Sequence, residues 1–370
     1  MAVKYKPFIN IGPGFYIEEE LETRGWTKQD LATILGLSST HVSELIHGKR
    51  AVSLETAKLL SKAFGQSPQY WLNLYTNYKL REEKTSKAEN ETEIKANILS
   101  HMPIADMVKK GWLPKWNGKL SRLVENVEQF WGRQGLDFAF MDKCAAPAFR
   151  KSDAFEKYNR YYALTWHHMA RKCAAQYKVE KYDSKKLTAI ANELAEYSYA
   201  ENGIECLIQD LAYAGVKFFI LPHLEKTYTD GSAFWDGDNP VIVWTGRFKR
   251  EDNFWFTVAH EIAHILFHLR SKKAVFIDSE NMDITEQEDE ANLFAQKAYK
   301  YDEIVSFLGG HKITVFMVRK CSEELKISPS LIVGQLRHHQ ILKHYQLRNL
   351  VNSDVLESIP DEFFADVRAA

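Results

Sequence analysis

Several features that define other classes of protein are scarce in this chain of 370 residues. Only four cysteines are present and no two form a CxxC pair, which excludes a cysteine zinc ribbon and favours reduced, buried thiols. No apolar run approaches the roughly 20 residues that a membrane helix needs, and the opening MAVKYKPFIN lacks the apolar segment of a signal peptide. We therefore expect a cytoplasmic protein with no membrane partner.

An excess of charge of one sign is also absent. Lys and Arg number 48 and Asp and Glu number 49, which gives a formal net charge of -1 at pH 7. This balance excludes a globally basic nucleic-acid coat, so any DNA binding must come from a local patch. The 45% hydrophobic content is enough for sizeable cores, and the length corresponds to about two to three domains.

The N-terminal segment from Phe15 to Leu80 predicts five short helices. The second helix has an N-cap candidate at Thr27 and ends at Gly36, and the third begins at Ser38 or Ser39 and carries THVSELI. Two helices joined by a tight turn, with small and apolar residues in their shared core, form a helix-turn-helix. The second helix of the pair would then read DNA.

The run from TKQDLATIL to SPQYWLNL resembles the XRE-type helix-turn-helix family and, within it, the HigA-type antitoxins, whose pattern ends in a similar SPxxWLNL helix. One departure is Lys28, where the family usually has Gln after the opening Thr. The resemblance implies a lambda-repressor-like bundle that binds a double-stranded DNA operator as a homodimer. The alternative is a bundle that has lost DNA binding and serves only dimerisation or partner binding. By position, the residues expected to face base edges are Ser39, Thr40, His41, Ser43 and Glu44, and those expected to contact the DNA backbone are Lys28, Lys49 and Arg50.

Composition divides the rest of the chain. Residues 81–93, REEKTSKAENETE, are almost wholly charged or polar and predict a linker or a solvated helix behind a DNA-binding domain over residues 1–80. A helical connecting region is predicted for residues 94–200, a metallopeptidase domain for 201–300 and a helical C-terminal region for 301–370. The fold class that follows is α+β, predominantly helical, with a small mixed sheet.

In the stretch FWFTVAHEIAHILFH, the spacing of two histidines and a glutamate indicates a metal site. This stretch follows two predicted strands, Val216 to Leu221 and Val241 to Trp244. On a helix, His260 and His264 lie at i and i+4 on one face, as the metal-binding histidines of zincins do. Glu261 is offset by one residue, so it can reach a metal-bound water rather than the metal. This pattern predicts a metal site with a general base.

The site needs a third ligand. His268 lies on the same helix face but one turn farther on, so we interpret it as a structural residue or a hydrogen-bond partner of a ligand. The later run TEQEDEANLFAQKA predicts a helix whose carboxylates, at Glu286, Glu288 and Glu290, would complete a His-His-Glu site of the gluzincin kind. Three further histidines have Arg and Lys neighbours, which favour a surface basic helix: His338, His339 and His344.

The segments FTVAHEIAHILFH, EDEANLFA and SAFWDGDNPVIVW together resemble the ImmA/IrrE family of metallo-endopeptidases, in which a Glu ahead of an AN-x-FA pattern is the third zinc ligand. By this register the residue is Glu288, with Glu290 as the first alternative, and Asn292 stands where related zincins have Asp. The resemblance implies Zn2+ as cofactor and Glu261 as the catalytic base. The implied zinc ligands are His260, His264 and Glu288.

Two functions are compatible with these patterns. The preferred one is a DNA-binding transcriptional regulator fused to a zinc endopeptidase, which cleaves a repressor or antitoxin-like protein in a stress or prophage response. Its substrate would pair as an added strand with a sheet edge near Val241 to Trp244. The alternative is a HigA-type antitoxin and autorepressor that neutralises a toxin partner, with a sensory or inactive zincin domain.

Overall fold

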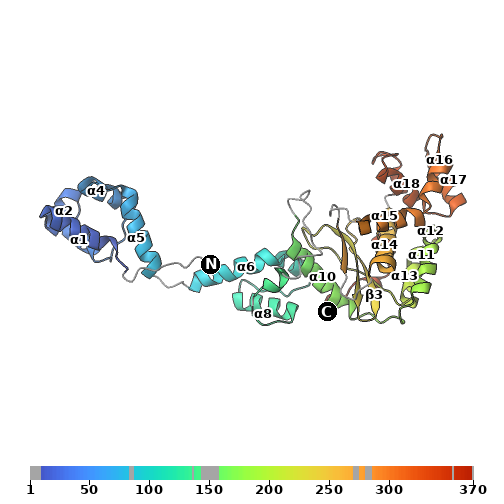
Figure 1. Cartoon of the computed structure of the whole chain (residues 1–370), viewed down its shortest axis with the longest axis horizontal. Helices are drawn as coiled ribbons and strands as arrows, with labels where there is room; N and C mark the ends of the chain where they lie inside the picture. The colour runs from blue at the N-terminus through green and yellow to red at the C-terminus, as the bar shows by residue number, and fades with distance from the viewer. Residues whose placement is uncertain are drawn as a thin grey trace. The chain divides into compact units, whose positions relative to one another are not determined.

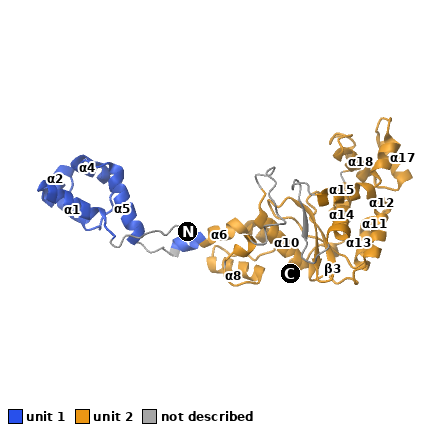
Figure 2. Cartoon of the chain, viewed as in Figure 1, with its two compact units in different colours: residues 1–93 blue, residues 94–370 orange. Residues whose placement is uncertain are grey.

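A computed structural model describes residues 10–82, 87–135, 137–142, 158–269, 275–279, 286–351 and 354–368. The chain divides into two compact units, Met1–Glu93 and Ile94–Ala370 (Figure 2). Within the described ranges, no helix is both long and apolar enough to cross a membrane.

The first unit contains the five helices that the sequence predicts. Thr27 caps the second helix in a capping box, because its side chain accepts from the Asp30 amide while the Asp30 carboxylate accepts from the Thr27 amide at 2.8 Å. Gly36 ends that helix at φ 67, a left-handed conformation that favours glycine. Ser38 caps the third helix through the His41 amide. The bounds are α1 (Pro13–Arg24), α2 (Lys28–Leu35), α3 (Ser39–Ile46), α4 (Leu54–Phe64) and α5 (Pro68–Glu82).

The polar segment 81–93 is helical wherever it is described. Helix α5 continues to Glu82, and α6 (Lys87–His101) begins five residues later. Most of the described side chains here are exposed, so the solvated helix agrees with the structure better than an extended linker does. The predicted domain bounds remain predictions.

The second unit is built on a mixed sheet in the order β1-β3-β2-β4. Strand β3 of this sheet is labelled in Figure 1. Strand β1 (Lys217–Ile220) pairs parallel with β3 (Asn239–Trp244), and β2 (Thr229–Asp236) pairs antiparallel with both β3 and β4 (Val275–Ser279). An α+β, mostly helical fold with a small mixed sheet is therefore confirmed.

Two features of the sheet differ from the expectations. The sequence predicts no strand between Leu221 and Val241, because TYTDGSAFWDGDNP is rich in turn residues, yet this segment contains β2. The Asp and Gly residues of β2 have little local strand propensity, and the strand depends on pairing at both edges. Strand β3 was expected to offer a free edge, but it lies between β1 and β2. The edge strands are β1 and β4, which moves the expected position of an added peptide strand to one of these two.

Helices cover both faces of the sheet, and strands β1 and β3 are therefore buried on both sides. On one face, Phe218, Ile242 and Trp244 pack with α14 (Glu251–Ala263) and with helices from both sides of it in the chain. On the other face, Phe219 and Val243 pack with the helices that precede the sheet in the chain. The elements of the second face are α6, α7 (Ile104–Lys109), α8 (Leu120–Trp131) and α10 (Arg160–Ala174).

The remaining helices extend the core around α14. Segments predicted as separate regions, 94–200 and 301–370, share their cores with residues 201–300. Near the C-terminus, Phe364 forms a parallel bridge with Ile220, so chain already lies along part of the β1 edge. The other elements are α11 (Ser184–Asn192), α12 (Leu194–Tyr199), α13 (Gly203–Tyr213), α15 (Glu286–Ala298), α16 (Tyr301–Leu308), α17 (Val315–Leu325), α18 (Pro329–His338) and the 3-10 turns η2 (Arg348–Leu350), η3 (Val355–Ser358) and η4 (Asp361–Phe363).

The cysteines only partly follow the expectation of burial. Cys173 and Cys321 are buried free thiols, whereas Cys206 is exposed because α13 turns Leu207 and Leu211 to the core instead. Cys144 lies outside the described residues.

Candidate metal centre

Helix α14 places the HExxH residues against the sheet and then changes its geometry. It begins with the acidic Glu251 and Asp252, which suit the positive end of the helix dipole. From His264 the chain continues as a π-helical turn, η1 (His264–His268), in which the Leu269 amide donates to the His264 carbonyl at 2.8 Å. Such i→i+5 turns are often found at functional sites.

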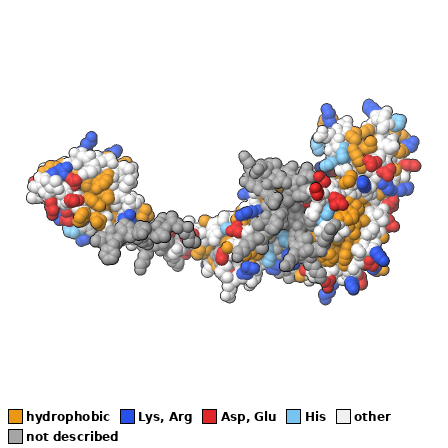
Figure 3. Space-filling view, viewed as in Figure 1, with side chains coloured by type: hydrophobic (Ala, Val, Ile, Leu, Met, Phe, Trp, Pro, Cys, Tyr) orange, Lys and Arg blue, Asp and Glu red, His pale blue; other side chains and the backbone are white. Residues whose placement is uncertain are grey.

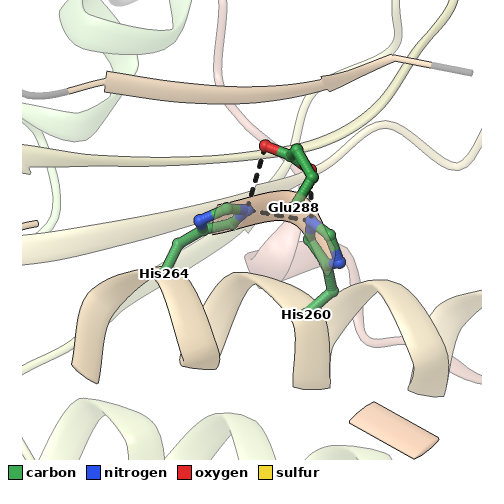
Figure 4. Close-up of side chains that lie close together, drawn as sticks. All are labelled: His260, His264 and Glu288. Carbon is green, nitrogen blue, oxygen red and sulfur yellow. Dashed lines mark hydrogen bonds and ion pairs between the residues drawn. The ribbon is translucent and has the colours of Figure 1, made fainter. Parts of the chain in front are cut away.

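Three side chains converge between α14, η1 and α15 (Figure 4). His260 Nε2 lies 2.9 Å from His264 Nε2 and 3.1 Å from Glu288 Oε2, and His264 Nε2 lies 3.5 Å from Glu288 Oε1. Of the three candidate carboxylates, the structure therefore brings Glu288 to the histidines. Within the described residues, this is the group of three that could hold a metal ion.

Burial sets the protonation of the group. His260 is 2% and His264 1% exposed. Burial lowers the pKa of His264 to about 4, against the opposing effect of the nearby Glu288 carboxylate. Burial would raise the pKa of Glu288, but its close contacts with His260 and His264 outweigh this effect and hold the pKa well below its usual range. At neutral pH the site thus offers a neutral imidazole and an ionised carboxylate, the forms in which these side chains bind metal.

The donor set fits zinc. Two imidazole nitrogens and one carboxylate, with a fourth position open, form the usual catalytic zinc set. Zn–N bonds of about 2.0–2.1 Å in a tetrahedron imply ligand separations of about 3.3 Å. The distances of 2.9 to 3.5 Å between the converging donor atoms bracket that value.

Glu261 lies beside the converging ligands and is completely buried, with 0% exposure. Strand β2 approaches it at Gly231, where an added Cβ would come within 2.5 Å of Glu261 Oε1 and 2.6 Å of Thr257 Cγ2. Only glycine lets the strand come this near the carboxylate, so this part of the turn-like TDGS sequence has a structural reason.

Other side chains orient the two histidines. Asn292 Oδ1 lies 3.0 Å from His260 Nδ1, which leaves His260 Nε2 directed to the site. His268 Nδ1 lies 2.9 Å from His264 Nδ1, and its Nε2 lies 3.0 Å from Glu290 Oε2. His268 therefore contacts the far side of a candidate ligand, as a hydrogen-bond partner would. Glu290, the alternative third ligand, contacts His268 instead of the converging nitrogens.

A cavity of about 430 Å³ adjoins the same helix pair. Phe256 and Gln296 line it, and they lie one helical turn from His260 and Asn292 respectively. The histidines interpreted as a surface basic helix line this cavity, and His339 stacks on Tyr301 with ring centroids 4.0 Å apart. Figure 3 shows histidine side chains among the C-terminal elements near α18. The chain's local charge pattern did not indicate this, because the cavity forms only when α18 packs on α14. The histidines concerned are His338, His339 and His344.

In the first unit, α3 buries Val42 and Leu45 and turns its other faces outward. Among the predicted base-contacting residues, Ser39 and Thr40 are exposed, and the other three are half-buried: His41, Ser43 and Glu44.

The predicted backbone-contacting cations are all exposed. Arg50 Nε donates to Glu44 Oε2 at 2.7 Å, and Lys28 Nζ donates to Glu18 Oε1 at 3.0 Å. The Arg50 contact offsets the negative charge of Glu44 on the predicted reading helix. Lys49 lies next to Arg50, beyond the end of α3.

Comparisons with known proteins divide the chain in the same way. A helix-turn-helix family matches residues 17–71, and the IrrE N-terminal-like domain of the Peptidase_M78 family matches residues 211–300. Virulence-associated protein A' of Dichelobacter nodosus is 39% identical over 69 residues, and the HTH-type transcriptional regulator YddM of Escherichia coli K12 is 38% identical over 74 residues. The chain belongs to the helix-turn-helix regulators and carries an IrrE-like domain.

The similarity to these two proteins covers only part of this chain. The matched stretches span 60% and 79% of the relatives' lengths but 18% and 20% of this chain. A solved structure, described as a hypothetical protein from E. coli, is 31% identical and covers 24% of this chain and 87% of its own, with a TM-score of 0.21, which is too low to support a conclusion. The IrrE-like domain belongs to a metallopeptidase-type family, and the candidate metal centre, between α14 and α15, lies within this domain.

Proposed function

We propose that this helix-turn-helix regulator is also a zinc-dependent endopeptidase. The observation that supports this most directly is the convergence of three buried or half-buried donor atoms beside a fully buried glutamate, Glu261. The proposed zinc ligands are His260, His264 and Glu288. Bound zinc would supply Lewis acidity to the scissile carbonyl and to a water.

Side chains of the protein would transfer the protons and orient the metal ligands. Glu261 would accept a proton from the attacking water on a carboxylate oxygen and then donate it to the leaving amine. Asn292 would keep His260 in the tautomer whose Nε2 faces the site. Because Glu261 is sealed from solvent by β2 and α14, this proton would not be lost to bulk water.

A peptide substrate would bind as an added strand at β4. This strand is the sheet edge on the side of β2, and Asp278 in β4 lies opposite Gly231, the residue that contacts Glu261. Neighbouring strands lie about 4.8 Å apart, so the backbone of a peptide paired with β4 would lie two spacings, about 9.6 Å, from Gly231. The cavity one turn from His260 would accept one of its side chains.

The substrate class we propose is a transcriptional repressor or antitoxin-like protein, cleaved in a stress or prophage response. The support is the fusion itself, because a DNA-binding domain brings the peptidase to promoters where such proteins are bound.

The direct test uses Glu261→Gln. The zinc-loaded protein is incubated with each repressor found encoded beside its gene, and products are identified by mass spectrometry. The variant should keep one zinc per chain and lose at least about 100-fold in cleavage rate, since it retains a polar side chain but cannot take the proton. Glu286→Gln, at an exposed position on α15, is the matched control and should cleave normally. Equal cleavage by Glu261→Gln and the wild-type protein would remove Glu261 from the mechanism.

The DNA half of the proposal is an operator-binding homodimer that uses α3 in the major groove. Support comes from the similarity to YddM, which is named as an HTH-type transcriptional regulator, and from the exposure of Ser39 and Thr40 at the start of α3. A gel shift on the DNA upstream of the protein's own gene tests it. If changing both Lys49 and Arg50 to Ala left binding unchanged, the proposed phosphate contacts would be wrong.

A second candidate function rests on the run from TKQDLATIL to SPQYWLNL, which resembles the HigA-type antitoxins. A HigA-type antitoxin would repress its own gene and neutralise a small toxin, with the IrrE-like domain as a sensor. A short basic frame encoded beside this gene, whose product binds the full chain and is inhibited by it, would support this role. Cleavage of a neighbouring repressor would support the peptidase instead.

A further inference from the structure

The π-helical turn at the end of α14 brings a third histidine against the metal centre without joining it. His268 Nδ1 lies 2.9 Å from His264 Nδ1, the nitrogen that faces away from the three converging donors. Its other nitrogen, Nε2, lies 3.0 Å from Glu290 Oε2. His264, His268 and Glu290 thus form a line of hydrogen-bonding groups from the buried site to a carboxylate that is 61% exposed.

The Glu290 carboxylate determines which ring nitrogens of His268 and His264 carry hydrogens. An ionised carboxylate only accepts hydrogen bonds, so His268 must carry its hydrogen on Nε2. In a neutral His268, Nδ1 is then an acceptor, and His264 must donate from its own Nδ1. This leaves the lone pair of His264 on Nε2, the nitrogen that faces His260 and Glu288.

The alternative arrangement is incompatible with a ligand. If His268 donated from Nδ1, His264 Nδ1 would have to accept, and the hydrogen of a neutral His264 would sit on Nε2. That nitrogen could not then bind a metal. The hydrogen bond between the two Nδ1 atoms therefore selects between a binding and a non-binding tautomer of His264.

Helix α15 supplies this control through residues on different faces. Glu288 and Asn292 are four positions apart and reach the site directly. Glu290 is offset from Glu288 by two positions, about 200° around the helix, so it meets the histidines only where η1 carries His268 one turn beyond His264. One helix thus holds the proposed third ligand and the groups that orient both histidines.

We infer that His268 and Glu290 are positioning residues that hold His264 in its metal-binding tautomer. This inference rests on the proposed zinc site. Losing a group that orients a ligand typically lowers metal affinity about 10- to 100-fold. We expect that range for His268, which is buried, and about 10-fold or less for Glu290, which is largely in water.

The experiment measures zinc affinity of the full chain by competition with a chromophoric chelator. His268→Phe keeps an aromatic ring and removes both nitrogens, whereas His268→Asn keeps an acceptor oxygen close to the position of Nδ1. Glu290→Ala removes the outer acceptor, and Glu290→Gln restores one. Glu286→Ala, which removes the same charge from an exposed position of α15, is the matched control.

The line of hydrogen-bonding groups predicts a graded loss of zinc affinity. His268→Phe should bind zinc about 10- to 100-fold more weakly than the wild-type chain, and His268→Asn should recover most of that loss. The zinc affinity of Glu290→Ala should be lower than that of Glu290→Gln. In metal-free protein, histidine ¹⁵N spectra should show a larger share of His264 protonated on Nδ1 in the wild-type chain than in His268→Phe, because only the wild-type chain has an acceptor beside Nδ1. A role limited to packing would not change the tautomer.

Two failures are distinguishable. If the wild-type chain binds no zinc, the proposed function fails. If the wild-type chain binds zinc and His268→Phe binds it equally tightly, the positioning role of His268 is overturned while the zinc site remains. The same conclusion follows if His268→Phe and His268→Asn weaken zinc binding alike and the His264 tautomer is unchanged.

Discussion

Replacing Gly231 with alanine would insert a methyl group where β2 meets the metal-binding helix. The new Cβ would lie 2.5 Å from Glu261 Oε1 and 2.6 Å from Thr257 Cγ2, whereas ordinary contacts begin at 3.4 Å. The shortfalls are 3.4 − 2.5 = 0.9 Å and 3.4 − 2.6 = 0.8 Å. Both neighbours are buried, at 0% and 2% exposure, so neither can move freely into solvent.

The expected result is a loss of about 1–3 kcal/mol in the free energy of unfolding, the usual cost of overfilling a packed interior. Urea unfolding of the full chain measures the loss, and hydrogen exchange of α14 peptides locates it in the second unit. The same displacement should lower the rate of any zinc-dependent cleavage about 100-fold, because the general base moves by nearly 1 Å.

Shortening the obstructing side chains supplies the control. Thr257→Ser removes Cγ2 and Glu261→Ala removes the carboxylate, so the cost of Gly231→Ala should shrink in each background, with coupling energies of about 0.5–3 kcal/mol. A cost for Gly231→Ala within about 0.5 kcal/mol of zero, or one that is the same in every background, would refute the close approach of β2.

Three further predictions concern metal, acid and DNA. His264→Ala should abolish zinc binding, so zinc at 1,000 times its Kd should stabilise the wild-type chain by about 4 kcal/mol and leave the variant unchanged, as measured by metal analysis and thermal unfolding. Burial lowers the pKa of His167 to about 3, from the ordinary value of 6.5 for histidine. The unfolded chain is therefore protonated first, and stability is lost as the pH falls from about 6.5 toward 3. Between pH 7.5 and 5.5 the loss from this group should be about 1.4 kcal/mol and should be missing in His167→Phe, as urea unfolding at the two pH values would show. Lys49→Ala should reduce the slope of log K against log salt by about 0.9. Arg50→Ala should weaken binding more, since it also uncovers the Glu44 carboxylate, and anisotropy titrations that rank the two variants the other way would contradict the ion pair.

The elements that were predicted correctly depend on contacts close in sequence. Thr27 and Asp30 form their capping box across three residues, and Gly36 ends its helix through its own backbone conformation. Leu120 to Trp131 repeats apolar residues at helical spacing and forms α8, within the region 94–200 that the sequence predicts to be helical. Such signals need no knowledge of the rest of the fold.

The strands show where this reasoning stops. In β2, the residues around Gly231 have the composition of a turn, and they form a strand because β3 and β4 pair with them on either side. The position of β3 inside the sheet, instead of at its edge, follows from a parallel partner more than 20 residues earlier in the chain. Pairing partners at such distances leave no local mark in the sequence.

For the candidate site, the sequence by itself determined the spacing of His260, Glu261 and His264, because helical geometry puts i and i+4 on one face wherever the helix lies. Only the tertiary structure decided which carboxylate of α15 meets them. Glu288 and Glu290 point in different directions from the helix, and the packing of α15 against α14 determines which of the two faces His260 and His264. It also decided the place of His268, because a π-helical turn, and not the spacing, directs its ring to the outer nitrogen of His264. Local periodicity specifies a face of a helix, and packing over long sequence distances specifies what that face meets.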